Sequence, residues 1–147
     1  MTDVVTSLQL EAIMPLRVAV LRKGTPVNHC NYPEDAYPDV VHLGIVRDDS
    51  VVATSTWFTK ECPEQVGVPA LQLKGMAVAE ALHGTGLGAL LIEAGLSLAR
   101  ERSADIVWAR ARDSAMGFYE RLLFVCAGDG FIDGPTAMPH HIVIRSL

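Results

Sequence analysis

The segment HGTGLGALL, residues 83–91, places three glycines within five positions at the start of an amphipathic stretch. Glycine lets the backbone approach a ligand closely and adopt positive φ. If a helix begins here, its first N–H groups have no intrahelical acceptor and lie at the positive end of the helix dipole. Such a turn binds phosphate groups. The segment therefore predicts an anion site, set against the simpler interpretation of a flexible connection whose glycines serve packing.

The spacing of these glycines raises the question of which phosphate ligand they hold. Gly84–Ala89 matches the dinucleotide pattern GxGxxG/A, and Asp105 lies about twenty residues further on, where that pattern has an acid. However, the acid should end the following strand, whereas Asp105 begins the apolar run DIVWARA. Residues 79–83 also separate the glycines from the preceding strand. NAD remains a disfavoured alternative, and the ATP-binding Walker pattern fails because no Gly-Lys-Ser/Thr follows.

Hydrophobic periodicity predicts the elements that must position this turn. Residues 40–47 and 51–59 read as an antiparallel hairpin, and residues 27–39 as an irregular Pro-rich loop. The helix from Gly86 lies between two strands, which a crossover should make parallel. The fold class is therefore α+β, with a mixed sheet whose N-terminal part is antiparallel. The predicted helices are residues 8–21, 86–102 and 114–122, with Ser7 and Ser114 as the candidate N-caps of the first and the third. The predicted strands are 40–47, 51–59, 71–78, 105–111, 124–129 and 137–147.

Length and charge restrict the function further. The 147 residues suit one domain, residues 1–147. The net charge of −5 and the absence of a Lys/Arg stripe argue against nucleic acid as a partner and weakly favour a cationic substrate. Cys30, Cys62 and Cys126 are too few and too scattered for a disulfide framework or a zinc site, and Cys126, on its strand, is expected to be a small buried side chain. With no signal sequence or membrane-length apolar run, we expect a soluble, cytoplasmic protein.

Two motifs resemble the GCN5-related N-acetyltransferase (GNAT) superfamily. MAVAEALHGTGLGALLIEAG is similar to the family's central motif, a strand followed by a connector, Arg/Gln-x-x-Gly-x-Gly/Ala and a helix. AMGFYERLLF is similar to its later motif, Ala-x-x-Phe-Tyr-Glu-x-x-Gly-Phe. The resemblance implies a GNAT-like acyl-CoA N-acyltransferase fold with the crossover at the cofactor site. It implies acetyl-CoA as co-substrate without a metal, and an amine acceptor on a small molecule or peptide. It also allows a homodimer through the last strands.

The resemblance assigns cofactor contacts residue by residue. Backbone groups of Met76, Ala77 and Val78 would hold the pantetheine arm, and the turn would hold the pyrophosphate. His83 stands where the family has Arg or Gln, Arg112 where it often has Asn, and Leu123 where it has Gly. His83 and Arg112 are both candidates for contact with CoA. The predicted cofactor-binding residues are Met76, Ala77, Val78, His83, Gly84, Thr85, Gly86, Leu87, Gly88, Ala89 and Arg112.

Acetyl transfer to an amine needs a proton donor for the departing thiolate, and Tyr119 is the candidate for this catalytic role. A phenol's ordinary pKa of about 10 lies within ~2 units of that of a thiol. The alternative for Tyr119 is a core aromatic beside Phe118. The base that deprotonates the amine stays open among His42, His140, His141, Glu34, Asp35 and Glu61, and the resemblance also allows an ordered water chain in place of a single base. The rival function is a non-catalytic acyl-CoA-binding or regulatory domain.

Overall fold

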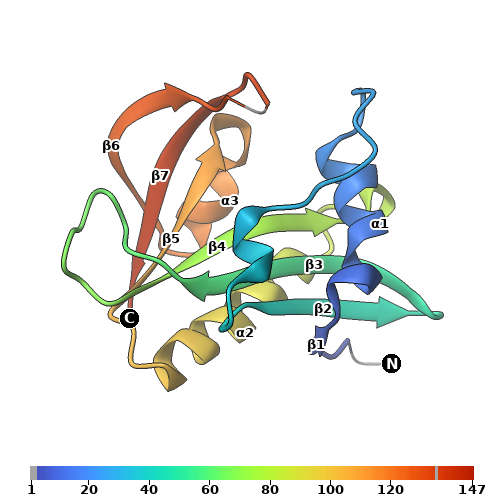
Figure 1. Ribbon diagram of the computed structural model, residues 1–147, viewed down its shortest axis with the longest axis horizontal. Coiled ribbons are helices and arrows are strands. Elements are labelled where there is room, and N and C mark those ends of the chain that lie inside the picture. Colours follow the sequence, from blue (N-terminus) through green and yellow to red (C-terminus); the bar gives the residue numbers. More distant parts are fainter. Residues whose placement is uncertain (1–2, 135) are drawn as a thin grey trace. The chain divides into compact units, whose positions relative to one another are not determined.

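The computed structural model describes residues 3–134 and 136–147 (Figure 1). The α-helices are α1 (Leu10–Leu21), α2 (Leu87–Glu101) and α3 (Met116–Arg121), and the 3-10 turns are η1 (Pro33–Ala36), η2 (Glu80–Leu82) and η3 (Asp113–Ala115). The strands are β1 (Thr6–Leu8), β2 (Val41–Arg47), β3 (Ser50–Thr59), β4 (Ala70–Val78), β5 (Ile106–Arg112), β6 (Val125–Ile132) and β7 (Pro139–Ser146).

The strand order is β1-β2-β3-β4-β5-β7-β6, in a mixed sheet. β2 and β3 pair antiparallel, as the sequence predicts for the hairpin. β4 and β5, the strands that flank α2, pair parallel from Ala70↔Ile106 to Leu73↔Ala109. The predicted α+β class and the parallel crossover are therefore confirmed. Contacts divide the chain into two compact units, one comprising the segment up to Phe58 and Lys74–Ser97, the other Thr59–Leu73 and Leu98–Leu147.

In the first unit, helices cover both faces of the antiparallel strands. Successive strand residues point to opposite faces, and Thr56 on β3 bonds to Arg17 of α1, whereas the neighbouring Trp57 packs on Gly95 of α2. A Cβ at Gly95 would lie 1.9 Å from the Trp57 ring, so this position has no room for a side chain. The alternation thus places α1 and α2 on opposite faces of β3 (Figure 1).

In the second unit, the start of β4, β5, β7 and β6 follow one another across the sheet. β7 pairs antiparallel with both β5 and β6, so the C-terminal end of β5 and the start of β7 meet, as Arg112↔His140 shows. One face of these strands forms a core around Trp108, whose indole donates to the Lys60 carbonyl at 2.8 Å. Figure 1 shows the head of β5 and the beginning of β7 at the same end.

Two local predictions are wrong. Ser7 does not cap α1, because it lies in the short strand β1, which the sequence analysis missed, and Gln9 takes the N-cap position without a side-chain bond. Ser114 does not cap α3, because it lies inside η3 and Ala115 precedes the helix. The predicted irregular loop 27–39 is confirmed, with one short 3-10 turn, η1, inside it.

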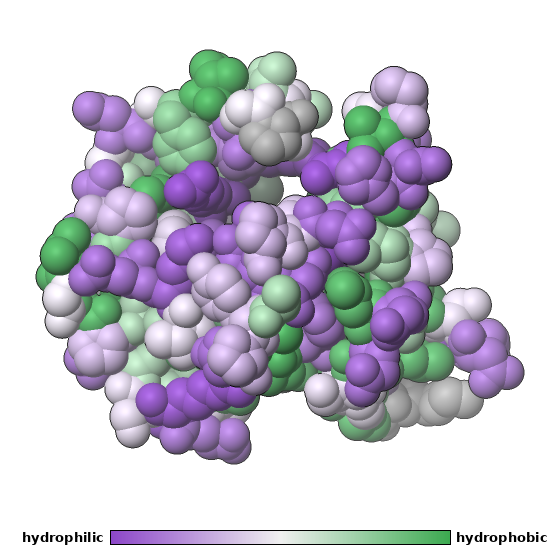
Figure 2. Space-filling model, viewed as in Figure 1, coloured by the Kyte–Doolittle hydropathy of each residue, from purple (hydrophilic) through white to green (hydrophobic). Residues whose placement is uncertain are grey.

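Within the described residues, no helix is long and apolar enough to cross a membrane. The face drawn in Figure 2 is mostly hydrophilic, with hydrophobic residues in scattered groups.

Candidate functional site

The predicted glycine turn joins β4 to α2 in the first unit. β4 ends at Val78, η2 follows, and the chain reaches α2 through residues 83–86. Gly84 and Gly86 have φ of +79° and +91°, and a Cβ on either would meet no atom within 4 Å. Both glycines are therefore required by backbone conformation, and the space above the turn is open on the side where each Cβ would stand.

The first turn of α2 presents backbone N–H groups that have no acceptor among the described residues. The Leu90 amide makes the first helical hydrogen bond, to the Gly86 carbonyl at 3.2 Å. The amides of Leu87, Gly88 and Ala89 precede that bond, so they lack intrahelical partners. The first turn also carries no acidic side chain that would compete with a bound anion. The turn thus fits the pyrophosphate site predicted from the sequence.

His83 folds back onto the end of β4. Its Nε2 lies 2.7 Å from the Val78 carbonyl oxygen, which can only accept, so the ring donates through Nε2. The Thr85 hydroxyl similarly donates to the Leu82 carbonyl at 2.6 Å. These two bonds hold the connector between β4 and α2. His83 therefore has a structural partner in addition to the predicted contact with CoA.

The end of β4, residues 76–78, directs two side chains into the core of the first unit. Met76 and Val78 pack against a cluster that includes Leu87 and Leu91 of α2. Immediately before them, Gly75 has φ of +65° in the interior of the strand, and a Cβ there would lie 3.0 Å from the Tyr32 ring. A positive φ inside a strand redirects the backbone that follows. The sequence analysis missed this irregularity, although an isolated glycine within a strand pattern is its usual signal.

Tyr119 lies on α3 in the second unit and is 6% exposed. Its ring makes edge contacts with Phe118 and Phe124, at centroid distances of 5.2 and 5.3 Å. Burial raises the pKa of Tyr119 to about 12. Its hydroxyl makes no hydrogen bond within the described part of the chain. The phenol thus stays protonated at neutral pH and has a proton to donate, although burial also makes it a weaker acid than an exposed tyrosine.

Arg112 ends β5, directly before η3 and α3. It lies opposite His140 of β7 in the pairing register. The structure therefore brings Arg112 to the strand end that leads into the Tyr119 helix. The remaining predicted cofactor residues, 76–78 and 83–89, lie in the first unit.

Two of the six candidate bases belong to a buried network around Arg17, whose side chain is fully buried. Arg17 Nη1 and Nη2 donate to the two carboxylate oxygens of Asp35 at 2.9 and 2.8 Å. Nη2 also donates to the Thr56 hydroxyl at 2.6 Å, and this hydroxyl lies 2.8 Å from His42 Nδ1. Since Thr56 accepts from Arg17, its own proton is available for Nδ1, and the proton of neutral His42 then sits on Nε2, 4.0 Å from Asp35.

The His42 environment disfavours the charged ring. Burial and the Arg17 charge lower the pKa of His42, and they outweigh the opposite effects of Asp35 and Glu11. Asp35 is an ionised carboxylate, because the bonds from Arg17 and Tyr32 and the Arg17 charge outweigh the effect of burial and lower its pKa. Neither group is suited to take a proton from an amine.

Glu34 and Glu61 also have structural partners. Glu34 is buried and receives a 2.8 Å bond from Lys74, and Glu61 accepts a 2.6 Å bond from the Gly67 amide. His140 is buried, stacks on Phe131 and donates through Nδ1 to the Met138 carbonyl at 2.8 Å. These three candidates therefore stabilise loops and strands.

His141 has a different environment. Its Nδ1 lies 2.7 Å from Oδ1 of Asp113, in the turn between Arg112 and α3, and its side chain is 29% exposed. His141 is one of the candidate bases predicted from the sequence, whereas its partner Asp113 lies 28 positions away and no local pattern links the two residues.

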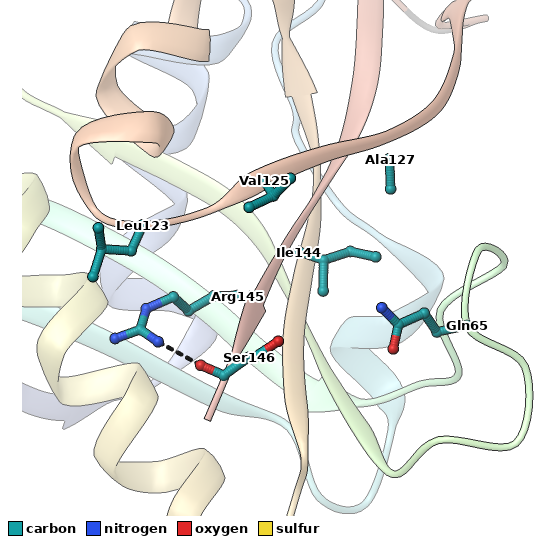
Figure 3. Close-up of a pocket in the computed structure, with 7 residues that line it drawn as sticks. All are labelled: Gln65, Leu123, Val125, Ala127, Ile144, Arg145 and Ser146. Carbon is teal, nitrogen blue, oxygen red and sulfur yellow. Dashed lines mark hydrogen bonds between the residues drawn. The ribbon is translucent and has the colours of Figure 1, made fainter.

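The second unit also carries a hollow of about 330 Å³, which lies away from these residues. Figure 3 shows it at the end of β7, with Gln65 reaching toward it from the β3–β4 loop and Arg145 bonded to the Ser146 carbonyl. None of the predicted site residues lines it. Its lining residues are Gln65, Leu123, Val125, Ala127, Ile144, Arg145 and Ser146.

Comparison with known proteins identifies the family to which this chain belongs. The model of the acetyltransferase (GNAT) family matches residues 11–124. The chain belongs to the GNAT family. It is 26% identical to the uncharacterized N-acetyltransferase YitI of Bacillus subtilis over 143 residues, which cover 97% of this chain and 95% of YitI. The sequence-based recognition is therefore confirmed.

Solved structures share the GNAT fold over nearly the whole chain. Escherichia coli ElaA is similar with a TM-score of 0.78 and 22% identity, covering 99% of this chain and all of ElaA. An aminoglycoside 6'-N-acetyltransferase complexed with coenzyme A has a TM-score of 0.71 and 12% identity, covering 97% and 96% of the two chains. GNAT membership supports acyl-CoA-dependent N-acyltransferase activity toward an amine acceptor. Across the described residues, no group of three His, Cys, Asp or Glu side chains is placed to hold a metal ion.

Proposed function

We propose that this protein transfers an acetyl group from acetyl-CoA to a primary amine of a small molecule or peptide, in a ternary complex. Residues 1–147 act as a single N-acetyltransferase domain. We expect it in the cytoplasm, because its three scattered cysteines suit a reducing compartment. Acetyl-CoA supplies the activated acetyl group.

The observation that carries the proposal is the first turn of α2. Two glycines at positive φ precede three amides that have no acceptor in the described part of the chain, and the first turn of α2 has no acidic side chain. This arrangement suits a pyrophosphate better than a structural connection, since a packed turn would not leave both Cβ positions in open space. The solved aminoglycoside acetyltransferase with bound coenzyme A supports the choice of CoA over NAD.

The cofactor contacts follow from this placement. Residues 84–89 hold the pyrophosphate through backbone N–H groups, and Met76, Ala77 and Val78 offer backbone groups to the pantetheine arm. Arg112, as the basic residue at the end of β5, is proposed to contact a phosphate group. His83 supports the site by holding the Val78 carbonyl at 2.7 Å.

Tyr119 is proposed to protonate the departing CoA thiolate. Its pKa of about 12 keeps the proton on the phenol before the reaction. No described residue accepts a hydrogen bond from the hydroxyl, so the proton is available to the thiolate. Transfer to the thiolate is uphill by the difference between the two pKa values, which a dry pocket reduces because it destabilises the thiolate. The Val78 amide is the proposed donor to the thioester oxygen as negative charge develops there.

The donor is tested by thermal unfolding with acetyl-CoA, free CoA, NAD or ATP in parallel. A ligand present at a hundred times its Kd adds about 2.7 kcal/mol to the free energy of unfolding, a shift of several degrees for a domain of this size. We expect stabilisation by acetyl-CoA and CoA alone. Stabilisation by NAD alone, or by none of the four, would contradict the proposal. Binding of acetyl-CoA without transfer to any of a panel of primary amines would favour the non-catalytic rival.

A further inference from the structure

The second unit holds a histidine–carboxylate pair that has no part in the proton donation proposed for Tyr119. His141 on β7 and Asp113 in η3 are joined by the 2.7 Å contact between Nδ1 and Oδ1. Asp113 immediately follows Arg112, and α3 with Tyr119 begins three residues after it. The pair therefore lies at the C-terminal end of β5, on the segment that leads into the Tyr119 helix.

The pairing fixes which ring nitrogen is available for chemistry. A carboxylate accepts hydrogen bonds, so His141 donates through Nδ1–H, and its neutral ring carries the lone pair on Nε2. Nε2 has no hydrogen-bond partner among the residues that the structure describes. The same bond fixes the orientation of the ring, because Asp113 Oδ1 holds Nδ1 at 2.7 Å. This is the arrangement of a general base held by an orienting acid.

The ring of His141 packs between β5 and β6 and stays 29% exposed. β5 places Ala111 opposite His141, and β6 places Gly130 against the ring. A Cβ at Gly130 would lie 2.8 Å from both Cε1 and Nε2 of His141. Asp113, from η3, is the charged side chain bonded to the ring, and the neighbouring Ala111 and Gly130 bring no charge. Gly130 provides the space in which the imidazole lies.

We propose that His141 is the general base that deprotonates the acceptor amine and that Asp113 is its positioning residue; this rests on the proposed function. His141 Nε2 takes one proton from the ammonium form of the amine and passes it to solvent. The amine nitrogen then forms a C–N bond to the acetyl carbon, and the C–S bond breaks. Tyr119 gives its proton to the thiolate and regains one from the new amide nitrogen. The products are the acetylated amine, CoA thiol and one released proton.

The other candidates lack one or more of these features. His42 is buried beside Arg17, and His140 is buried with a neutral carbonyl as its Nδ1 partner. Asp35, Glu34 and Glu61 accept bonds from Arg17, Lys74 and Gly67. His141 combines partial exposure, a carboxylate partner and a ring nitrogen, Nε2, that has no hydrogen bond to any described residue.

The test compares His141→Gln with wild type, using the primary amine of the panel that gives the highest turnover. We expect kcat/KM for the amine at pH 7 to fall about 10²- to 10⁴-fold, with the Kd of acetyl-CoA unchanged. The deficit should shrink by about tenfold for each pH unit above 7, because the free amine fraction rises by that factor below its pKa. A loss that is constant with pH would indicate a structural role and overturn the proposal, as would full activity.

Two further variants test whether activity depends on the position of the His141 ring and not on histidines in this strand in general. Gly130→Ala keeps His141 but displaces its ring, and we expect kcat to fall at least tenfold with the fold retained. His140→Gln is the matched control next in sequence, which should lower the Tm by removing the stack on Phe131 but keep kcat within about twofold. Equal effects of the His140 and His141 variants on kcat would contradict the assignment.

A measurement without substrate keeps the inference independent of the proposed activity. Nitrogen-15 NMR of the histidine rings at pH 8 should show His141 as the Nδ1–H tautomer, and Asp113→Asn should weaken that preference. An Nε2–H tautomer in wild type would overturn the base assignment. If instead no amine is acetylated and CoA does not bind, the proposed function fails while the tautomer result stands by itself.

Discussion

Arg17 and Asp35, 18 residues apart, meet through two hydrogen bonds of 2.8 and 2.9 Å that join α1 to η1. Both side chains are almost completely buried, at 0% and 6% exposure. Arg17 also donates to the Cys30 carbonyl and lies over the Tyr32 ring. The segment that the sequence analysis predicted as an irregular loop is therefore tied to α1 and β3 by one buried guanidinium.

Asp35→Asn should lower the free energy of unfolding by about 3–5 kcal/mol, because it leaves Arg17 buried without its counter-charge. The measurement is urea unfolding at pH 7. Glu80→Gln is the matched control, since it removes the charge partner of an exposed lysine, Lys23, and should leave stability nearly unchanged. Equal effects of the two substitutions would show that the buried pair does not hold this segment.

His42 predicts a dependence of stability on pH. Burial and Arg17 lower its pKa below the ordinary 6.5, so between the two pKa values the unfolded chain binds more protons than the folded protein. The contribution is therefore fully present above pH 6.5 and is lost as the pH falls below it. His42→Gln should flatten the free energy of unfolding between pH 7 and 5 relative to wild type. A slope equal to that of wild type over this range would contradict the prediction.

Leu123 predicts a stabilising substitution. It follows α3 with φ of +67° and is 68% exposed. A non-glycine residue in this left-handed conformation is strained, and the side chain contributes little packing. Leu123→Gly should raise the free energy of unfolding by about 0.5–1 kcal/mol, seen as a higher Tm. Leu123→Ala keeps a Cβ and should not stabilise. If alanine raised the Tm as much as glycine does, the gain would come from removing the leucine side chain and not from relief of backbone strain, which would contradict the prediction.

Gly86→Ala tests the anion turn. The substitution strains a residue at φ +91° without a clash, because the space around its Cβ is open. We expect the Kd of CoA to rise about tenfold, measured by calorimetry, as the turn leaves its binding conformation. Gly67→Ala is the matched control at φ +84°, also in open space; it should cost similar stability and leave the Kd unchanged. If both variants bind CoA as wild type does, the turn is not the pyrophosphate site.

The sequence predicted what depends on periodicity and local spacing. The β2–β3 hairpin, the parallel crossover through α2 and the glycine turn follow from neighbouring residues, and the structure confirms these elements. Cys126 was expected to be buried on its strand, but it is exposed because it lies on β6, at the end of the strand order. Strand order depends on pairing between distant segments, so periodicity alone does not reveal an edge.

Side-chain pairs between distant segments could not be predicted from the local sequence, for the same reason. Asp113 and His141 lie close together because β5 and β7 pair antiparallel. The sequence around either residue carries no signal of that pairing. Leu123 was noted as a departure from a family glycine, and its positive φ supplies the physical reason for that glycine.

The central claim is acetyl transfer with Tyr119 as the proton donor, and Tyr119→Phe tests it most directly. CoA release and the mass of the acetylated amine would be measured together with the Kd of acetyl-CoA. We expect kcat to fall at least tenfold with the Kd unchanged, since phenylalanine keeps the contacts with Phe118 and Phe124 but has no proton to give. Turnover equal to wild type would remove Tyr119 from the reaction and contradict this account.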